Sequence, residues 1–156
     1  MRQPTAITFV LCIATAAFAD GTTTIRHVEC AAYAELSRLP LARIEGAARA
    51  NADADRLRDA HMSEALKLGA PLVEEESGFP GILKPIPIGG SAEAGIGFFL
   101  ASVVTIQNDL FELLHAAPQA NAQSIEDRFE QLADWYRLRA AEMTSRYEVS
   151  RCSDLL

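Results

Sequence analysis

Apolar side chains recur along this chain at steps of three and four residues, a spacing that places them on one face of a helix. The clearest example is the stretch 124–152, whose apolar face is formed by Ile125, Phe129, Leu132, Tyr136, Ala140, Met143 and Tyr147. Ser124, followed three residues later by Asp127, is typical of a helix start. We therefore expect a long amphipathic helix here, and its apolar face requires a partner surface.

Two further helices are predicted before the middle of the chain. Residues 25–39 place Val28, Ala31, Ala32, Leu36 and Leu39 on one face. Pro40 then breaks or kinks the helix because proline lacks a backbone donor, or it begins the next helix. Residues 41–68 form a long alanine-rich helix, since alanine has the highest helix propensity. Gly69 and Pro71 are expected to end it.

A third helix is predicted over residues 92–115, with Ser91 as its cap. Its first half is apolar nearly all the way round, so we expect it to be buried between neighbouring helices. The stretch is too short and too rich in glycine for a transmembrane span. The sequence thus predicts no stable membrane insertion.

Residues 70–90 interrupt the helical pattern between the second and third helices with four prolines and four glycines. The segment is nevertheless apolar, unlike a linker, and it contains Phe79, Ile82, Leu83, Ile86 and Ile88. A connection this long is usually functional or packed on itself. Two alternatives stay open: the loop contacts a partner, or it folds back on the third helix.

The first 19 residues have the layout of a secretory signal peptide. Arg2 precedes an apolar run at residues 6–17, which is too short to span a membrane, and the run ends in small residues. We expect cleavage between Ala19 and Asp20, a periplasmic or secreted location, and a single helical domain over residues 20–156.

Two cysteines, Cys30 and Cys152, remain after this cleavage. In an oxidising compartment such a pair favours a disulfide, which here closes a loop of about 120 residues and stabilises the fold by about 4–5 kcal/mol. A bond between the first and last helices requires an even number of antiparallel helices. The fold class predicted is therefore all-α, an antiparallel four-helix bundle with a long Pro/Gly-rich apolar loop between helices 2 and 3.

The net charge of the chain limits the classes of partner that we expect. The chain has 14 basic and 21 acidic residues, and loss of Arg2 with the leader leaves 13 against 21, a net charge of −8. This balance disfavours nucleic acids and anionic membrane surfaces.

No catalytic, metal-binding or cofactor motif is found in the sequence. His61, on an apolar stripe with Glu64 nearby, lacks the second histidine of a zinc motif, and we expect it to be a boundary residue. His27 and His115 are expected at opposite ends of the bundle. The haem attachment pattern C-x-x-C-H is absent. The sequence predicts no cofactor, no metal site and no catalytic residues.

Two hypotheses of function follow. The first is a non-enzymatic protein-interaction or structural module with a protein partner; its candidate contacts are Phe79, Ile82, Leu83, Ile86 and Ile88 of the loop, together with Trp135. Trp135 lies off the centre of its helix's apolar stripe, and the alternative for it is the edge of the core. The second hypothesis is a carrier or sensor of a small apolar ligand in the bundle core, where Phe98 and Phe99 stand among many small residues.

Overall fold

The computed structural model describes residues 22–41, 43–74, 91–118 and 124–156. These residues form a first helix at 22–36, α2 (Ala47–Glu74), α3 (Ala92–Leu114), α4 (Ile125–Val149) and a 3-10 turn, η1 (Cys152–Leu155). This part of the chain has no strand, and the all-α prediction is confirmed. The predicted signal peptide and the apolar loop residues from Phe79 to Ile88 lie outside the described residues.

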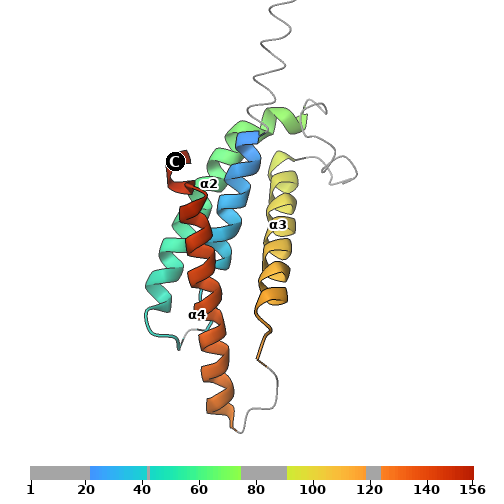
Figure 1. Cartoon of the computed structure of the whole chain (residues 1–156). Coiled ribbons are helices and arrows are strands. Elements are labelled where there is room, and N and C mark those ends of the chain that lie inside the picture. Colours follow the sequence, from blue (N-terminus) through green and yellow to red (C-terminus); the bar gives the residue numbers. More distant parts are fainter. Residues whose placement is uncertain (1–21, 42, 75–90, 119–123) are drawn as a thin grey trace, which may run out of the picture.

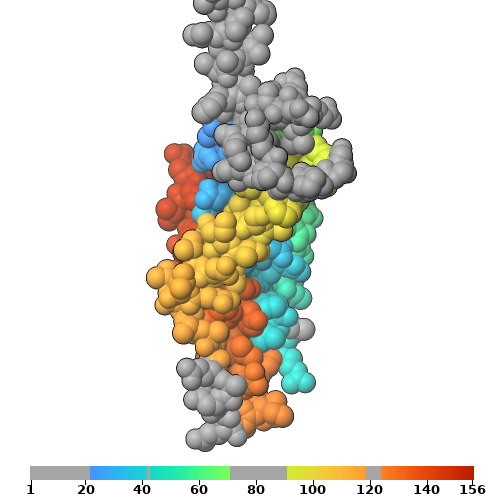
Figure 2. All heavy atoms as spheres, turned by 90° about the vertical axis from the view of Figure 1, so that its right-hand side faces the viewer, coloured from blue at the N-terminus to red at the C-terminus, as the bar shows by residue number. Residues whose placement is uncertain are grey.

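The first helix contacts each of the other three (Figure 1). Its buried side chains include the small residues Ala31 and Ala32, which allow neighbouring helices to approach closely. Figure 2 shows α3 lying obliquely across the surface of the other helices. The C-terminus lies near the start of the first helix, where the disulfide Cys30–Cys152 joins them with a Cα–Cα distance of 5.7 Å. The predicted cysteine pairing is confirmed.

The connection after the first helix is held by a side chain of α2. The helix ends at residue 36, ahead of Pro40. The backbone N–H of Leu39 donates to Oδ1 of Asn51 (2.7 Å), and Nδ2 of Asn51 donates back to the Leu39 carbonyl (2.9 Å). Asn51 therefore satisfies the backbone that the helix end leaves unpaired.

The predicted bounds of the second helix are wrong at both ends. It begins at Ala47, after Gly46 with its positive φ of 77°, and it continues through Gly69 to Glu74. A Cβ at Gly69 would lie 2.9 Å from both Ile96 Cδ1 and Thr24 Cγ2. Glycine is thus present at this position because the first helix and α3 approach α2 closely there, and it does not end the helix.

The starts of α3 and α4 agree with the sequence. Ser91 accepts a hydrogen bond from the Ala94 N–H (3.2 Å), and Ser124 accepts one from the Asp127 N–H (3.0 Å). Both serines have extended backbones, as N-cap residues do. The two predicted caps are confirmed.

Candidate functional site

The outward side of α3 carries exposed apolar side chains among polar ones such as Thr105 and Asp109. Four exposed side chains recur there at helical spacing: Phe98 (49% exposed), Ile106 (57%), Leu110 (44%) and Leu113 (81%). We call these four residues the α3 face. In the first half of the helix, Ile96 and Phe99 are buried against Val28 and Ala65. The prediction that this half is buried between neighbours is wrong, because the other helices cover only one side of it.

The charges of α3 are all negative. Glu93, Asp109 and Glu112 lie on this helix, which has no lysine or arginine. By length and composition, α3 is also the one helix among the described residues that is apolar enough to cross a membrane. Only 17% of its apolar stretch is buried. Its predicted shortness is therefore wrong. Helices of soluble proteins can have the same length and apolar composition, so the predicted lack of stable membrane insertion stays a prediction.

A chain of polar side chains crosses the core beneath the first helix. Nδ1 of His27 lies 3.0 Å from Nδ1 of His61, and Nε2 of His61 lies 2.8 Å from the hydroxyl oxygen of Tyr147. These residues come from the first helix, α2 and α4, and all three are buried. We call them the histidine chain. His61, expected at the core boundary, is fully buried, and its pairing with His27 was not predicted.

The histidine chain is closed and uncharged. A 3.0 Å contact between two ring nitrogens requires a proton on one of them and a lone pair on the other. Burial, with the neighbouring His27, lowers the pKa of His61 from its ordinary value of 6.5 to about 4. Burial also lowers the pKa of His27, against the opposing effect of Glu64. No group of three or more metal-binding side chains exists in the described parts of the chain. The arrangement therefore satisfies buried polar groups.

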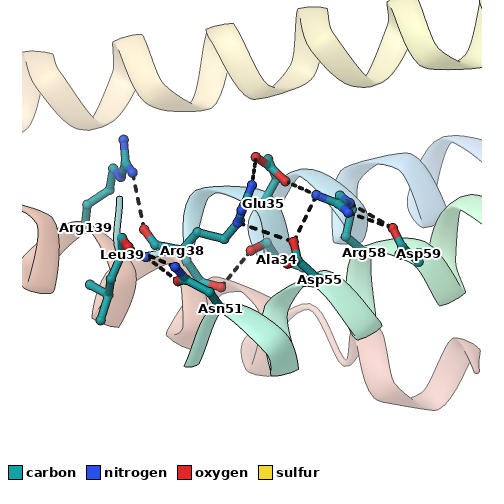
Figure 3. A network of polar contacts seen from close by, with 10 residues as sticks. Ala34, Glu35, Arg38, Leu39, Asn51, Asp55, Arg58, Asp59 and Arg139 are labelled. Atoms are coloured by element: carbon teal, nitrogen blue, oxygen red, sulfur yellow. Dashed lines mark hydrogen bonds and ion pairs between the residues drawn. The ribbon is translucent and has the colours of Figure 1, made fainter. Parts of the chain in front are cut away.

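A second polar region is open to solvent. A groove of about 580 Å³ lies where the first helix ends, and all four helices or their ends line it: Leu36, Arg38, Asn51, Val104, Asn108 and Arg139 contribute side chains. Figure 3 shows the polar network on one wall of this groove. Here Arg38 pairs with Glu35 (3.1 Å) and Asp55 (3.3 Å). Arg58 pairs with the same two carboxylates, at 2.7 and 3.1 Å.

Arg139 has a different environment. Its guanidinium lies over the ring of Tyr136, with Cζ 5.0 Å from the ring centroid, and beside the ring of Trp135 at 5.7 Å. It donates to Oδ1 of Asn108 (3.1 Å) and, at a long 3.5 Å, to the Arg38 carbonyl. Among the described residues it forms no ion pair, and its buried Nε has no hydrogen-bond partner. Burial lowers the pKa of Arg139.

Trp135, one of the predicted contact residues, lies at the edge of the core. Its Nε1–H donates to the His115 carbonyl (3.0 Å), and its ring packs edge-on against Phe111. His115 in turn contacts Glu142 at 2.9 Å, away from the other two histidines. The structure therefore does not bring Trp135 to the α3 face. Periodicity along one helix does not reveal such neighbours, because they depend on how two helices are aligned.

Comparison with known protein families, curated proteins and solved structures found no match for this chain.

Proposed function

We propose that this protein is an exported, non-enzymatic interaction module that binds a helical segment of a protein partner on the α3 face. The observation that carries this proposal is the exposure of Phe98, Ile106, Leu110 and Leu113 on one side of a single helix. Exposed apolar side chains at this spacing are typical of a surface that accepts an amphipathic helix. The disulfide Cys30–Cys152 is compatible with an oxidising, exported location.

The charges around the α3 face select the partner. Asp109 and Glu112 lie on or beside it, and the helix carries no compensating lysine or arginine. A partner helix with an apolar stripe bordered by lysine or arginine complements this pattern. A second copy of the chain would bring carboxylates opposite carboxylates, and an anionic membrane surface would repel them. We therefore favour a basic amphipathic helix of another protein.

The scaffold that we propose is an antiparallel four-helix bundle. The supporting contacts pair rising residue numbers on one helix with falling numbers on its neighbour: His27–His61 and Leu39–Asn51 between the first helix and α2, and Gln107–Arg146 and His115–Glu142 between α3 and α4. Such a scaffold presents α3 as a rigid surface.

The binding chemistry is tested with two synthetic helical peptides that share one apolar stripe and differ only in having lysine or glutamate beside it. The lysine peptide should bind more tightly, and added salt should weaken its binding because screening acts on the flanking charges. The variant Ile106→Gln/Leu110→Gln should lose binding while keeping its melting temperature, since both side chains are exposed. Equal affinity for both peptides would contradict the proposal.

The natural partner is sought with a photo-crosslinking residue at position 106 in the full-length protein, expressed in its own host. The matched control carries the same residue at Ala52, an exposed position on α2. We expect a discrete protein adduct from position 106 alone, attached to a helical segment rich in lysine or arginine. Adducts to lipid or to a second copy of the chain would replace the proposed partner with that one.

A further inference from the structure

We propose that the groove beside Arg139 is a binding site for a small organic monocarboxylate. The groove has a volume of about 580 Å³, within the range of small-molecule sites. None of the four residues of the α3 face lines the groove, although Asp109 lies beside both, and this inference does not depend on the proposed function.

The proposal is supported by a contrast between Arg139 and the other two arginines of this polar network, Arg38 and Arg58. Arg38 and Arg58 share Glu35 and Asp55 in direct ion pairs. Glu112, whose charge opposes the lowering of the Arg139 pKa by burial, accepts a hydrogen bond from Asn108 and forms no ion pair with Arg139. Arg139 has only neutral acceptors, the side-chain amide of Asn108 and the Arg38 carbonyl. Withdrawing a guanidinium from water without an anionic partner is unfavourable, and a bound carboxylate would supply the missing charge.

The position of Arg139 favours a planar anion. The rings of Tyr136 and Trp135 lie 5.0 and 5.7 Å from Cζ of Arg139 and pack around the guanidinium, whose N–H groups form hydrogen bonds in its own plane. Its donor contact to the Arg38 carbonyl is long, at 3.5 Å, so a carboxylate oxygen replaces a poor acceptor with a charged one. Figure 3 shows the side chain pointing from α4 toward α3, across the groove.

The remaining walls limit the ligand's size and charge. Leu36 and Val104 provide apolar contact for a short hydrocarbon body. Glu35 and Asp109 also line the groove, and their repulsion grows with the negative charge of the ligand, whereas Arg139 can pair with a single carboxylate. The site should therefore prefer a monocarboxylate to inorganic phosphate or a dicarboxylate.

Trp135 gives a direct test, because it is the one tryptophan of the chain and its ring lies 5.7 Å from Cζ of Arg139. The purified, oxidised protein is titrated with 3-methylbutanoate, with the matched neutral 3-methylbutanamide and with inorganic phosphate, all at constant ionic strength, and tryptophan emission is recorded. We expect a saturable change with 3-methylbutanoate and a response at least tenfold weaker with the other two. An unchanged emission, or equal responses to acid and amide, would overturn the proposal.

Two variants locate the binding. Arg139→Gln should weaken 3-methylbutanoate binding about 10- to 100-fold, the effect of losing a charge-assisted hydrogen bond. Arg137→Gln is the matched control, since Arg137 is exposed on the same helix and pairs with Asp134 (2.7 Å). Wild-type affinity in Arg139→Gln would place the ligand elsewhere. If that variant does not fold, Asp109→Asn is the second test. Its affinity for phosphate should rise severalfold, because the carboxylate that repels a multiply charged anion is gone. An unchanged phosphate affinity would overturn the proposed selection by charge.

Discussion

The histidine chain and the groove beside Arg139 are both polar regions between packed helices, yet they differ in how their polar groups are satisfied. In the histidine chain, His61 has a partner on each ring nitrogen, at 3.0 and 2.8 Å, and both partners belong to the protein. In the groove, Arg139 carries a full charge and finds only neutral acceptors. A region that satisfies itself stabilises the fold, whereas a charge left without its counter-ion indicates a place for a ligand.

The largest loss of stability around the histidine chain is expected when the disulfide beside it is removed. Cys30, Cys152 and Tyr147 belong to one core cluster, so the disulfide holds the helices that carry the histidine chain. The Cys30→Ala/Cys152→Ala variant should lose about 4–5 kcal/mol of stability, because the loop that the bond closes is long. Denaturant unfolding in wild type with and without reductant measures this loss. A loss below about 1 kcal/mol would show that the helices hold together without the bond.

Acid should open the histidine chain next. In the folded state the pKa of His61 is lowered to about 4 from 6.5, so the unfolded state binds more protons between these values. Stability should therefore be complete above pH 6.5 and fall as the pH drops toward 4, by about 3 kcal/mol in total. About 2 kcal/mol of this should be lost above pH 5, before carboxylates with a lowered pKa such as Glu35 contribute.

The control for the acid effect replaces both rings. The His27→Leu/His61→Leu variant should show a flatter dependence of unfolding free energy on pH between 6.5 and 5. A slope that survives the loss of both buried histidines would mean that other groups titrate.

A smaller effect is expected at Tyr147, the last member of the histidine chain. Tyr147→Phe removes only the hydroxyl group that lies 2.8 Å from Nε2 of His61, leaving that nitrogen buried without its partner. The expected cost is about 1–2 kcal/mol, measured by urea unfolding at pH 7.5. The conservative exchange Tyr136→Phe, on the same helix but outside the chain, is the control.

The smallest effect is expected in the open region. Arg139→Gln removes a desolvated charge as well as its cation–π contact with Trp135, and these contributions oppose each other. The free energy of unfolding should change by less than about 1 kcal/mol. A loss as large as that for the disulfide would show that Arg139 is structural, and it would remove the contrast between the two regions.

The features that could be predicted from the sequence are those that depend on neighbouring residues. Helix type follows from spacing, and the caps at Ser91 and Ser124 follow from local chemistry. The pairing of Cys30 with Cys152 joins distant residues, yet it was predicted because no other cysteine lies beyond the predicted signal peptide.

The features that were missed depend on how separate helices align. Gly69 was interpreted as a helix stop because its close contact with Ile96 and Thr24 is tertiary. The 3.0 Å contact of His27 with His61 depends on the register between the first helix and α2, which no single-helix pattern contains. Similarly, the apolar composition of α3 did not reveal which side its neighbours would leave exposed.

The bond between Cys30 and Cys152 also bears on how the protein withstands proteases. It makes one covalent ring of all residues between the two cysteines, so a single cut anywhere in that ring releases no fragment. The nicked protein would keep its full mass on a non-reducing gel and separate into two pieces only after reduction. Its helices would stay at high effective concentration and reassemble around the cut.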